Sequence, residues 1–244
     1  MKCWSVLLLL LLYAQAQAGA GWDQRLGASL PLDLTFVDET GRTTQLGEYF
    51  GSVPVVIVFG YFHCARLCPE VFAGVREGLR DAGVSPNRDY RLLAVSIDPT
   101  DTPVSAKEHA TPFSTQAGMH LLTSQTGSEA QLAHAAGFAY VPSSERTEFA
   151  HPAGFVIATP GGTISRYFFG VRYPAEEIRA ALDVAREDRT GNFTERLLMI
   201  CSSLAAPHAG QSAWILHTLR ALVITTLGAL AMLGWRAFAN RTPK

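Results

Sequence analysis

Two cysteines, Cys64 and Cys68, are the residues with the clearest chemical potential in this chain, and they lie in the segment 60–69 (GYFHCARLCP). Two soft thiolates four positions apart can chelate one metal ion, or they can close as a disulfide. The thioredoxin redox motif has two residues between its cysteines, whereas this pair has three, and the wider spacing suits a metal better than rapid disulfide exchange. The alternative is a pair of buried structural cysteines, which a motif this short leaves open.

The surrounding residues place this pair at a junction between a strand and a helix. Residues 53–60 (VPVVIVFG) form a continuous apolar run that is typical of a strand buried on both faces, and residues 69–79 follow with apolar side chains at helical spacing. The carboxyl ends of strands are where sites form in open α/β sheets. A helix start also stabilises a thiolate, to which Arg66 adds a positive charge. The sequence therefore predicts a thiolate site at this junction.

A histidine is the third candidate ligand. His151 lies in a loop just before a strand expected at 155–159, a position from which an imidazole can reach the cysteine segment. The chain contains seven histidines, however, and a lone loop histidine is more often solvated than bound to a metal. Residue type and spacing alone do not select His151 over the other candidates, which are His63, His109, His120 and His134.

The rest of the chain between its two ends alternates between strand and helix patterns. The further elements that we expect are a strand at 90–97, a helix beginning at Thr102 and Pro103, a strand at 119–123, a helix at 127–138, a hairpin of 155–159 and 163–169 with its turn at Gly161 and Gly162, and a helix at 174–185. This order predicts an α/β fold with a central mixed sheet flanked by helices, in one domain covering 19–187. Fold class alone does not establish a function.

The N-terminus has the features of a secretory signal peptide covering residues 1–18. Lys2 supplies a positive charge, residues 6–12 are an unbroken apolar run, and Ala16 and Ala18 have the spacing that a signal peptidase accepts. The apolar run is too short to span a bilayer. An uncleaved N-terminal anchor is the alternative interpretation.

The C-terminus predicts a transmembrane helix at 213–235, after a tether at 188–212 and before a cytoplasmic tail at 236–244. At about 1.5 Å per residue the segment can cross a hydrocarbon core, and tryptophans lie near both of its ends. Lys and Arg are absent from 197–213 and frequent in the tail, so the positive-inside rule places the domain outside. Because Arg220 lies within the segment, an amphipathic helix docked on the domain is the alternative.

Together the two termini predict a single-pass protein of the bacterial inner membrane with its domain in the periplasm. Removal of the signal peptide takes away Cys3 and leaves Cys64, Cys68 and Cys201. An odd number of cysteines in an oxidising compartment argues against a disulfide scaffold and for at least one thiol with a function. Cys201, in the tether, is either an auxiliary thiol or an incidental one. The formal net charge of -1 gives no indication of a nucleic-acid partner.

Three ordered motifs give the chain a resemblance to a known family. They are the segment 60–69, the segment 95–103 (VSIDPTDTP), and His151 followed by 155–168 (FVIATPGGTISRYF). Over residues 30–185 the chain resembles Sco/SenC proteins. Members of that family have a thioredoxin-like fold, bind copper, and help to metallate the binuclear copper centre of cytochrome c oxidase.

The resemblance implies which residues bind the metal. Carried over position by position, Cys64, Cys68 and His151 are copper ligands, and Asp98 lies close to the site, with a role in supporting the ligands or in docking a partner. Two thiolates and an imidazole suit Cu(I) and also admit Cu(II), whereas a structural zinc site normally has a fourth protein ligand. The implied partner is the oxidase subunit that carries the binuclear copper site, or another copper or thiol client.

The chain departs from the family pattern at two points. Ala65 and Arg66 stand where members usually have proline and an acidic residue, and the added positive charge should lower the thiolate pKa and alter the redox potential or the partner. The membrane anchor is also expected at the C-terminus, whereas the well-known relatives are anchored at the N-terminus. Both departures point to a subgroup whose client differs.

Three functions therefore compete. The first is a membrane-anchored metallochaperone for the copper centre of cytochrome c oxidase. The second is a thiol–disulfide oxidoreductase that keeps the copper-ligand cysteines of a client reduced, with Cys64 and Cys68 as its redox pair; it does not need His151. The third is a peroxidase of the peroxiredoxin type, which the sequence disfavours because no cysteine activated by a Thr-x-x-Cys motif is apparent.

Overall fold

The computed structural model describes residues 20–64, 67–109, 119–143, 148–190, 221–222 and 224–226. By its internal contacts the chain forms two units, Met1–Asn192 and Phe193–Lys244. The strands and helices named below all belong to the first unit.

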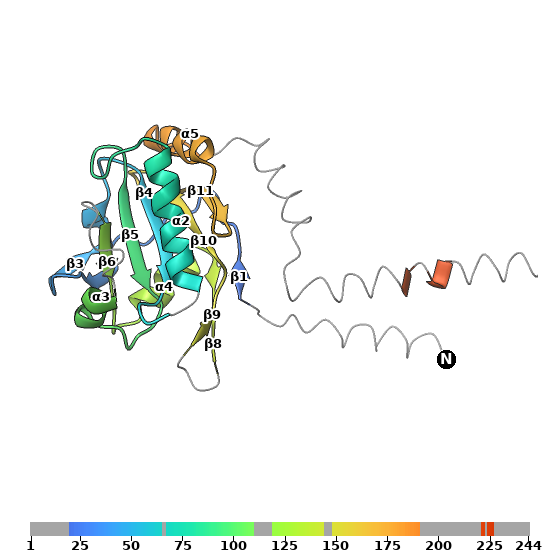
Figure 1. The fold of residues 1–244 in the computed structure, drawn as a ribbon, viewed down its shortest axis with the longest axis horizontal. Coiled ribbons are helices and arrows are strands. Elements are labelled where there is room, and N and C mark those ends of the chain that lie inside the picture. The colour runs from blue at the N-terminus through green and yellow to red at the C-terminus, as the bar shows by residue number, and fades with distance from the viewer. Residues whose placement is uncertain are drawn as a thin grey trace, which may run out of the picture. The chain divides into compact units, whose positions relative to one another are not determined.

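The first unit combines short strands with four α-helices among its described residues (Figure 1). In chain order the elements are β1 (Gly21–Trp22), β2 (Thr35–Val37), β3 (Thr43–Gln45), the 3-10 helix η1 (Leu46–Tyr49), β4 (Val55–Gly60), α2 (Leu67–Asp81), β5 (Arg91–Ser96), α3 (Pro103–His109), β6 (Met119–Leu122), α4 (Ser128–Ala135), β7 (Phe138–Ala139), β8 (Val141–Pro142), β9 (Phe149–Ala150), β10 (Gly154–Ala158), β11 (Ile164–Phe169) and α5 (Ala175–Arg186).

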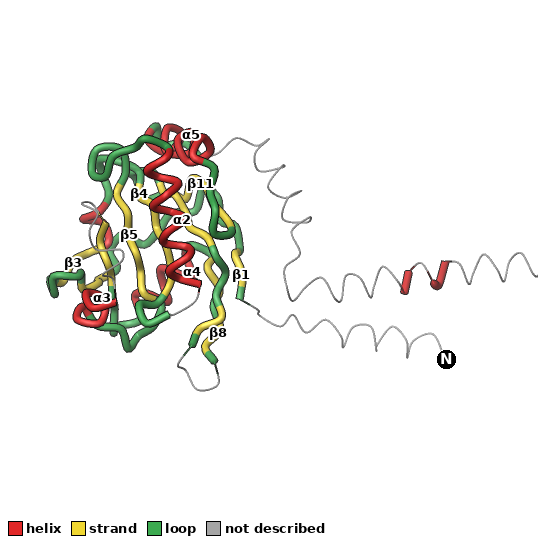
Figure 2. Tube along the Cα trace, in the orientation of Figure 1, coloured by secondary structure: helices red, strands yellow, loops and turns green. Residues whose placement is uncertain are grey.

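Five strands form the central sheet, in the order β11-β10-β4-β5-β6. The strands β4, β5 and β6 are parallel, with Val58 opposite Ala94 and Ala94 opposite Leu121, whereas β10 runs antiparallel to both β4 and β11. Figure 2 shows these strands running beside one another with helices around them. The mixed α/β fold expected from the sequence is confirmed, and it is thioredoxin-like.

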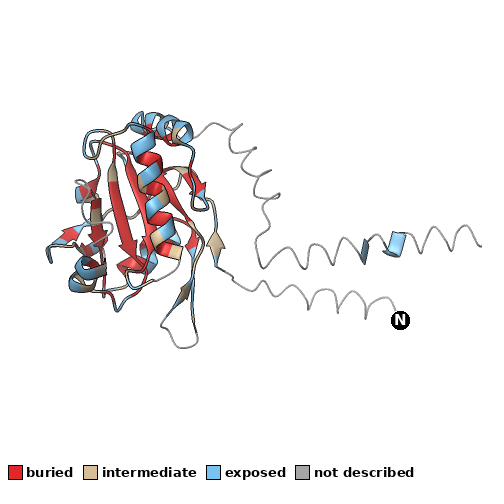
Figure 3. Cartoon of the chain, in the orientation of Figure 1, coloured by how far each residue is buried: buried red, intermediate tan, exposed pale blue. Residues whose placement is uncertain are grey.

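The strand β4 lies in the middle of the sheet, which explains its apolar sequence. All six of its residues are buried, because β5 and β10 flank it and α2 lies over one of its faces. α2 buries one stripe of side chains spaced three or four residues apart, while its opposite side is exposed (Figure 3). The members of the stripe are Cys68, Val71, Phe72, Val75 and Leu79. This packing fixes the start of α2 beside the carboxyl end of β4.

Most of the expected elements are confirmed, with bounds that agree within two residues. The exception is the helix expected at 127–138, which ends at Ala135 as α4. Phe138 instead belongs to β7 and pairs with Trp22 of β1, and the two rings pack edge to face with their centroids 4.8 Å apart. Tertiary packing of the two aromatic rings has overridden the local helical spacing. The strands β1, β2, β3, β8 and β9 are not predicted by any sequence pattern, because each has only two or three residues.

Several expected segments lie outside the described residues. These are the signal peptide at 1–18, most of the tether at 188–212 including Cys201, most of the membrane segment at 213–235, and the tail at 236–244. The second unit, taken by itself, is helical at 221–222 and 224–226. Within the described part of the chain, no helix combines the length and the apolar character that a membrane crossing requires.

Candidate metal centre

The two cysteines lie where β4 ends and α2 begins. After Gly60 the chain makes a turn, in which the Cys64 N–H donates a hydrogen bond of 3.3 Å to the Tyr61 carbonyl. Cys68 follows in the first turn of α2. Both cysteines are thiols; Cys68 is buried and Cys64 is half-buried. The thiols therefore lie at the strand–helix junction that the sequence predicts.

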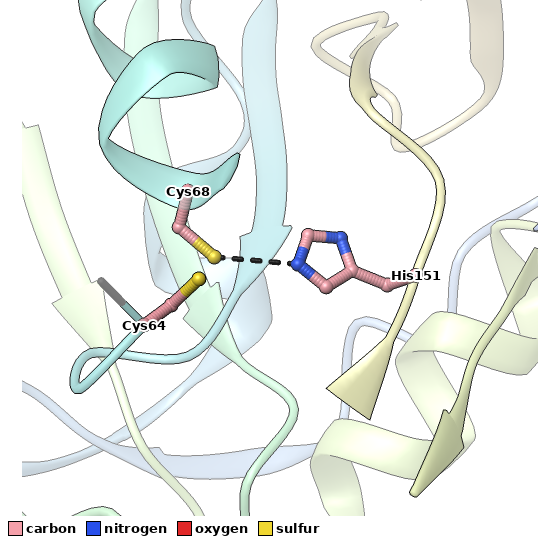
Figure 4. A group of neighbouring side chains, drawn as sticks. All are labelled: Cys64, Cys68 and His151. Carbon is pink, nitrogen blue, oxygen red and sulfur yellow. Dashed lines mark hydrogen bonds between the residues drawn. The ribbon is translucent and has the colours of Figure 1, made fainter. Parts of the chain in front are cut away.

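His151 reaches the same place from a distant part of the chain. It directly follows β9, and its Nε2 lies 3.3 Å from the Sγ of Cys68 (Figure 4). The two cysteine sulfurs and a ring nitrogen of His151 all lie within 4.8 Å of one another. Because metal bonds to sulfur and to imidazole nitrogen are about 2.0 to 2.3 Å long, one ion can contact all three after small side-chain adjustments. That these residues bind copper stays a prediction at this point.

The contact of the His151 Nδ1 indicates which tautomer the ring adopts. The Nδ1 lies 3.1 Å from the carbonyl oxygen of Pro152. A carbonyl only accepts hydrogen bonds, so the Nδ1 carries the proton and the Nε2 presents its lone pair towards Cys68. An imidazole oriented in this way by a backbone carbonyl is the usual arrangement of a metal-binding histidine.

The two sulfurs are close enough to affect each other's ionisation. The neighbouring Cys64 sulfur, followed by burial, holds the pKa of the Cys68 thiol well above its ordinary value. The helix start and Arg66 led us to expect a lowered pKa; the opposite holds for Cys68 because a second negative charge is disfavoured beside the first and away from water. Ala65 and Arg66 lie outside the described residues. A cation held between the sulfurs would remove this penalty, so the electrostatics fit a metal.

Tyr61 connects the two sides of the site. Its ring packs edge to face against Phe149 and His151, with centroids 5.3 Å and 5.9 Å away, and its hydroxyl interacts with the Cys64 sulfur. Burial, followed by this contact with Cys64, raises the pKa of Tyr61 to about 12. Phe138 packs against the other side of the histidine, with ring centroids 5.9 Å apart. Aromatic rings therefore set the position of His151.

Two glycines make room for the site. A Cβ at Gly60 would lie 3.1 Å from the Cys68 sulfur, so a larger residue at this position would push against the thiol. Gly154, at the end of the loop that carries His151, has a φ of +142°, and a Cβ there would lie 2.2 Å from the Phe168 carbonyl oxygen. Only glycine adopts this backbone conformation readily.

A family model described as SCO1/SenC matches residues 23–186. The chain belongs to the SCO1/SenC family. A search of curated proteins found no match. The matched range contains both cysteines, His151 and every named strand except β1.

Solved structures share the fold of this SCO1/SenC chain. A putative electron transfer protein from Aquifex aeolicus is 27% identical, with a TM-score of 0.62, and the match covers 70% of this chain and 98% of that one. Bradyrhizobium japonicum ScoI, solved with copper bound, is 22% identical with a TM-score of 0.51, over 65% of this chain and 98% of its own. BsSco, a member of the Sco family of cytochrome c oxidase assembly proteins in which a disulfide switch has been identified, is 22% identical with a TM-score of 0.55, over 67% and 96%.

Asp98 does not belong to the group of three ligand atoms in this SCO1/SenC protein. It is buried, and its Oδ2 lies 3.4 Å from the Nε2 of His63, the residue next to Cys64. It therefore contacts the cysteine segment through His63, and its role in supporting the ligands or docking a partner stays a prediction. The other histidines that the sequence left open also lie elsewhere: His63 faces Asp98 and Asp101, His120 pairs with Glu39, and His134 is in the last turn of α4, while the His109 side chain lies outside the described residues.

Sequence reasoning missed two residues that shape the site. Tyr61 lies within the cysteine motif, and its ring contacts with Phe149 and His151 come from the fold and not from a local pattern. Asp101 lies within the second motif, where it is buried and accepts the Phe62 N–H over 2.9 Å. An acidic residue next to a predicted strand end was the available signal, since a buried carboxylate must find donors.

Proposed function

We propose that this protein binds one copper ion through Cys64, Cys68 and His151 and delivers it for assembly of the copper centre of cytochrome c oxidase. The single observation that carries the proposal is the convergence of the three ligand atoms within 4.8 Å of one another. Two thiolates and an imidazole are soft to borderline ligands, which suit Cu(I) and also admit Cu(II). A closed zinc site would normally need a fourth protein ligand.

The exposure of the ligands suits a carrier rather than a permanent metal site. Cys68 is buried, whereas Cys64 and His151 are both half-buried and accessible from solvent. A client thiolate can therefore approach the ion on that side and replace one ligand at a time. Family membership, and the copper bound to Bradyrhizobium japonicum ScoI, support copper as the cargo.

The client that we propose is the oxidase subunit with the binuclear copper site. Its support is the family to which the chain belongs and the description of BsSco as a cytochrome c oxidase assembly protein. We place the domain in the periplasm, behind a cleaved signal peptide at 1–18 and tethered to the inner membrane by a helix at 213–235. Fusions of a reporter to residue 190 and to the C-terminus test this topology, with activity on opposite sides of the membrane expected.

A thiol–disulfide oxidoreductase is the second candidate function, and the closeness of the two thiols is the observation that favours it. In that reaction a thiolate attacks a client disulfide, a mixed disulfide forms, and the second thiol resolves it. The client gains two electrons and two protons, while Cys64 and Cys68 close as a disulfide. The half-buried Cys64 would attack, because burial and the raised pKa of Cys68 make that thiol the poorer nucleophile.

The test is a titration of the full-length protein in detergent with Cu(I), in competition with a chromophoric chelator under reducing conditions. We expect one tightly bound Cu(I) per chain, and no such binding in Cys64→Ser. Wild-type protein that fails to compete for Cu(I) would contradict the proposal. Disulfide reduction that is unchanged in His151→Ala, without copper binding in the wild type, would favour the oxidoreductase.

A further inference from the structure

The turn that carries Cys64 is held by a buried carboxylate outside the cysteine motif. The two central residues of this turn are Phe62 and His63. Asp101 holds both: its Oδ2 accepts the Phe62 N–H over 2.9 Å, and its Oδ1 lies 3.5 Å from the His63 Nδ1. The Asp101 side chain, on the β5–α3 loop, therefore contacts the backbone of Phe62 and the side chain of His63, the two residues that precede Cys64.

Asp101 is itself unable to reorient without loss of hydrogen bonds. Ser96 donates its hydroxyl to the Oδ2 over 2.6 Å, and Ser105 donates to the Oδ1 over 3.2 Å. The side chain is 2% exposed. A buried carboxylate with this many donors is held in place, because a rotation would break the hydrogen bonds from Ser96 and from the Phe62 N–H.

His63 also contacts a second buried carboxylate, that of Asp98. Its Nε2 lies 3.4 Å from the Oδ2 of Asp98, whose Oδ1 accepts the N–H and the hydroxyl of Thr100, both over 2.7 Å. The imidazole thus lies between two buried carboxylates, one facing each ring nitrogen. In either neutral tautomer at least one carboxylate can accept an N–H from the ring.

The same three residues could be considered as a second cation site, because one ligand atom from each lies within 4.8 Å of the others. The contacts argue against that. The two carboxylates face opposite nitrogens of one ring, and both oxygens of Asp101 already accept hydrogen bonds from protein donors. The arrangement is instead a hydrogen-bonded network of Asp98, Asp101 and His63, which we call the clamp.

We propose that Asp101 and His63 are positioning residues for Cys64, and that they set where its sulfur lies relative to Cys68 and His151. The effect on Cu(I) affinity rests on the proposed function. The effect on the reduction potential of the Cys64–Cys68 disulfide does not. Groups that hold metal ligands in place typically change metal affinity about 10- to 100-fold when they are replaced. The clamp positions Cys64, one of the three ligands, through contacts with Phe62 and His63, the two residues that precede it.

The test compares Asp101→Asn, His63→Ala and the double variant with Asp38→Asn, all in the full-length protein. Asp38 is a matched control: it is a buried carboxylate that accepts the N–H and the hydroxyl of Thr40, as Asp98 does for Thr100, and it lies on the turn between β2 and β3. We measure Cu(I) affinity by chelator competition. The reduction potential of the Cys64–Cys68 disulfide, measured by equilibration in a redox buffer, is the readout that needs no copper.

We expect Asp101→Asn to lower Cu(I) affinity about 10- to 100-fold and His63→Ala about tenfold, with the double variant no weaker than Asp101→Asn because both act through one turn. The thiol–disulfide equilibrium should shift about tenfold, or about 30 mV, in the same variants. Asp38→Asn should change neither quantity. If Asp101→Asn does not fold, His63→Ala decides, because that side chain is 36% exposed and its loss leaves the core intact.

Wild-type affinity and potential in His63→Ala would overturn the inference, as would equal changes in Asp38→Asn. Wild-type protein that binds no Cu(I) would remove the proposed function but not this inference, because the shift in the reduction potential still tests the clamp.

Discussion

The two halves of the candidate metal centre are held in place by different forces. The cysteine half is local in sequence: the end of β4, one turn and the start of α2 carry both thiols, and hydrogen bonds to buried Asp101 fix the turn. The histidine half depends on a contact between residues 83 positions apart. His151 lies between short β9 and β10, where ring packing and one carbonyl orient it.

This contrast indicates how each half contributes to binding. The cysteine half is preorganised by directional hydrogen bonds, so the Cys64 and Cys68 sulfurs stay close together whether or not His151 lies within bonding distance of the metal. The histidine half is placed by the shapes of Tyr61 and Phe138, which tolerate small displacements better than a buried hydrogen-bond network does. We therefore expect the loss of either cysteine ligand to abolish tight copper binding, and the loss of the histidine ligand to weaken it.

The largest expected effect is the difference between Cys68→Ser and His151→Ala. Replacing Cys68 removes one of two soft sulfur ligands, and Cu(I) affinity should fall by a factor on the order of 1,000 or more. His151→Ala leaves both sulfurs and should cost about 10- to 100-fold, with an altered Cu(II) spectrum. Chelator competition measures both. Equal losses in the two variants would break the comparison between the halves.

The next effect concerns the backbone that carries His151. Gly154→Ala forces a residue into a φ of +142° and against the Phe168 carbonyl, so it should destabilise the fold by about 3 kcal/mol or more. Gly51→Ala is the matched control, because Gly51 also has a positive φ, of +100°, but has open space around its Cβ position. Thermal unfolding should show the larger loss for Gly154→Ala. A loss no greater than that of Gly51→Ala would show that the close approach to Phe168 is unimportant.

The smallest effect is a pH dependence at Tyr61, where the two halves meet. Burial, followed by the contact with Cys64, raises the pKa of Tyr61 to about 12. Because the folded value lies above the unfolded value of about 10, this contribution to stability is fully present below about pH 10 and is lost as the pH rises through about 12. In an ultraviolet titration of tyrosine ionisation, Tyr61→Phe should remove one group from those that ionise near pH 12. Removal of a group that ionises near pH 10 would mean that Tyr61 is solvated.

The same contrast explains how much could be predicted from the sequence. The strand at β4, the helix α2 and the thiol pair between them all follow from short-range patterns, because apolar periodicity and motif spacing are local properties. His151 did not follow from such patterns; only the family resemblance selected it among the histidines. Its position depends on β9, a strand of two residues that is too short to show an alternation of apolar and polar side chains. It also depends on the rings of Tyr61 and Phe138, which come from distant segments.

The hydrogen-bond network behind the cysteines shows a second limit. Asp98 was placed near the site by the resemblance, yet its partner is His63 and not the group of sulfurs. The place of Asp101 after a predicted strand marked it as a candidate, but its hydrogen-bond partners could not be predicted, because burial of a polar side chain is a property of the folded chain. The raised pKa of Cys68 was missed for the same reason: the sequence shows Arg66 nearby but not how close the two sulfurs lie.

The most direct test of the central claim is X-ray absorption at the copper edge on the full-length protein loaded with one equivalent of Cu(I). The account predicts two sulfur ligands and one imidazole nitrogen in the wild type, with both sulfur ligands kept and the imidazole signal lost in His151→Ala. A copper ion without sulfur ligands, or an imidazole signal that survives in His151→Ala, would contradict it.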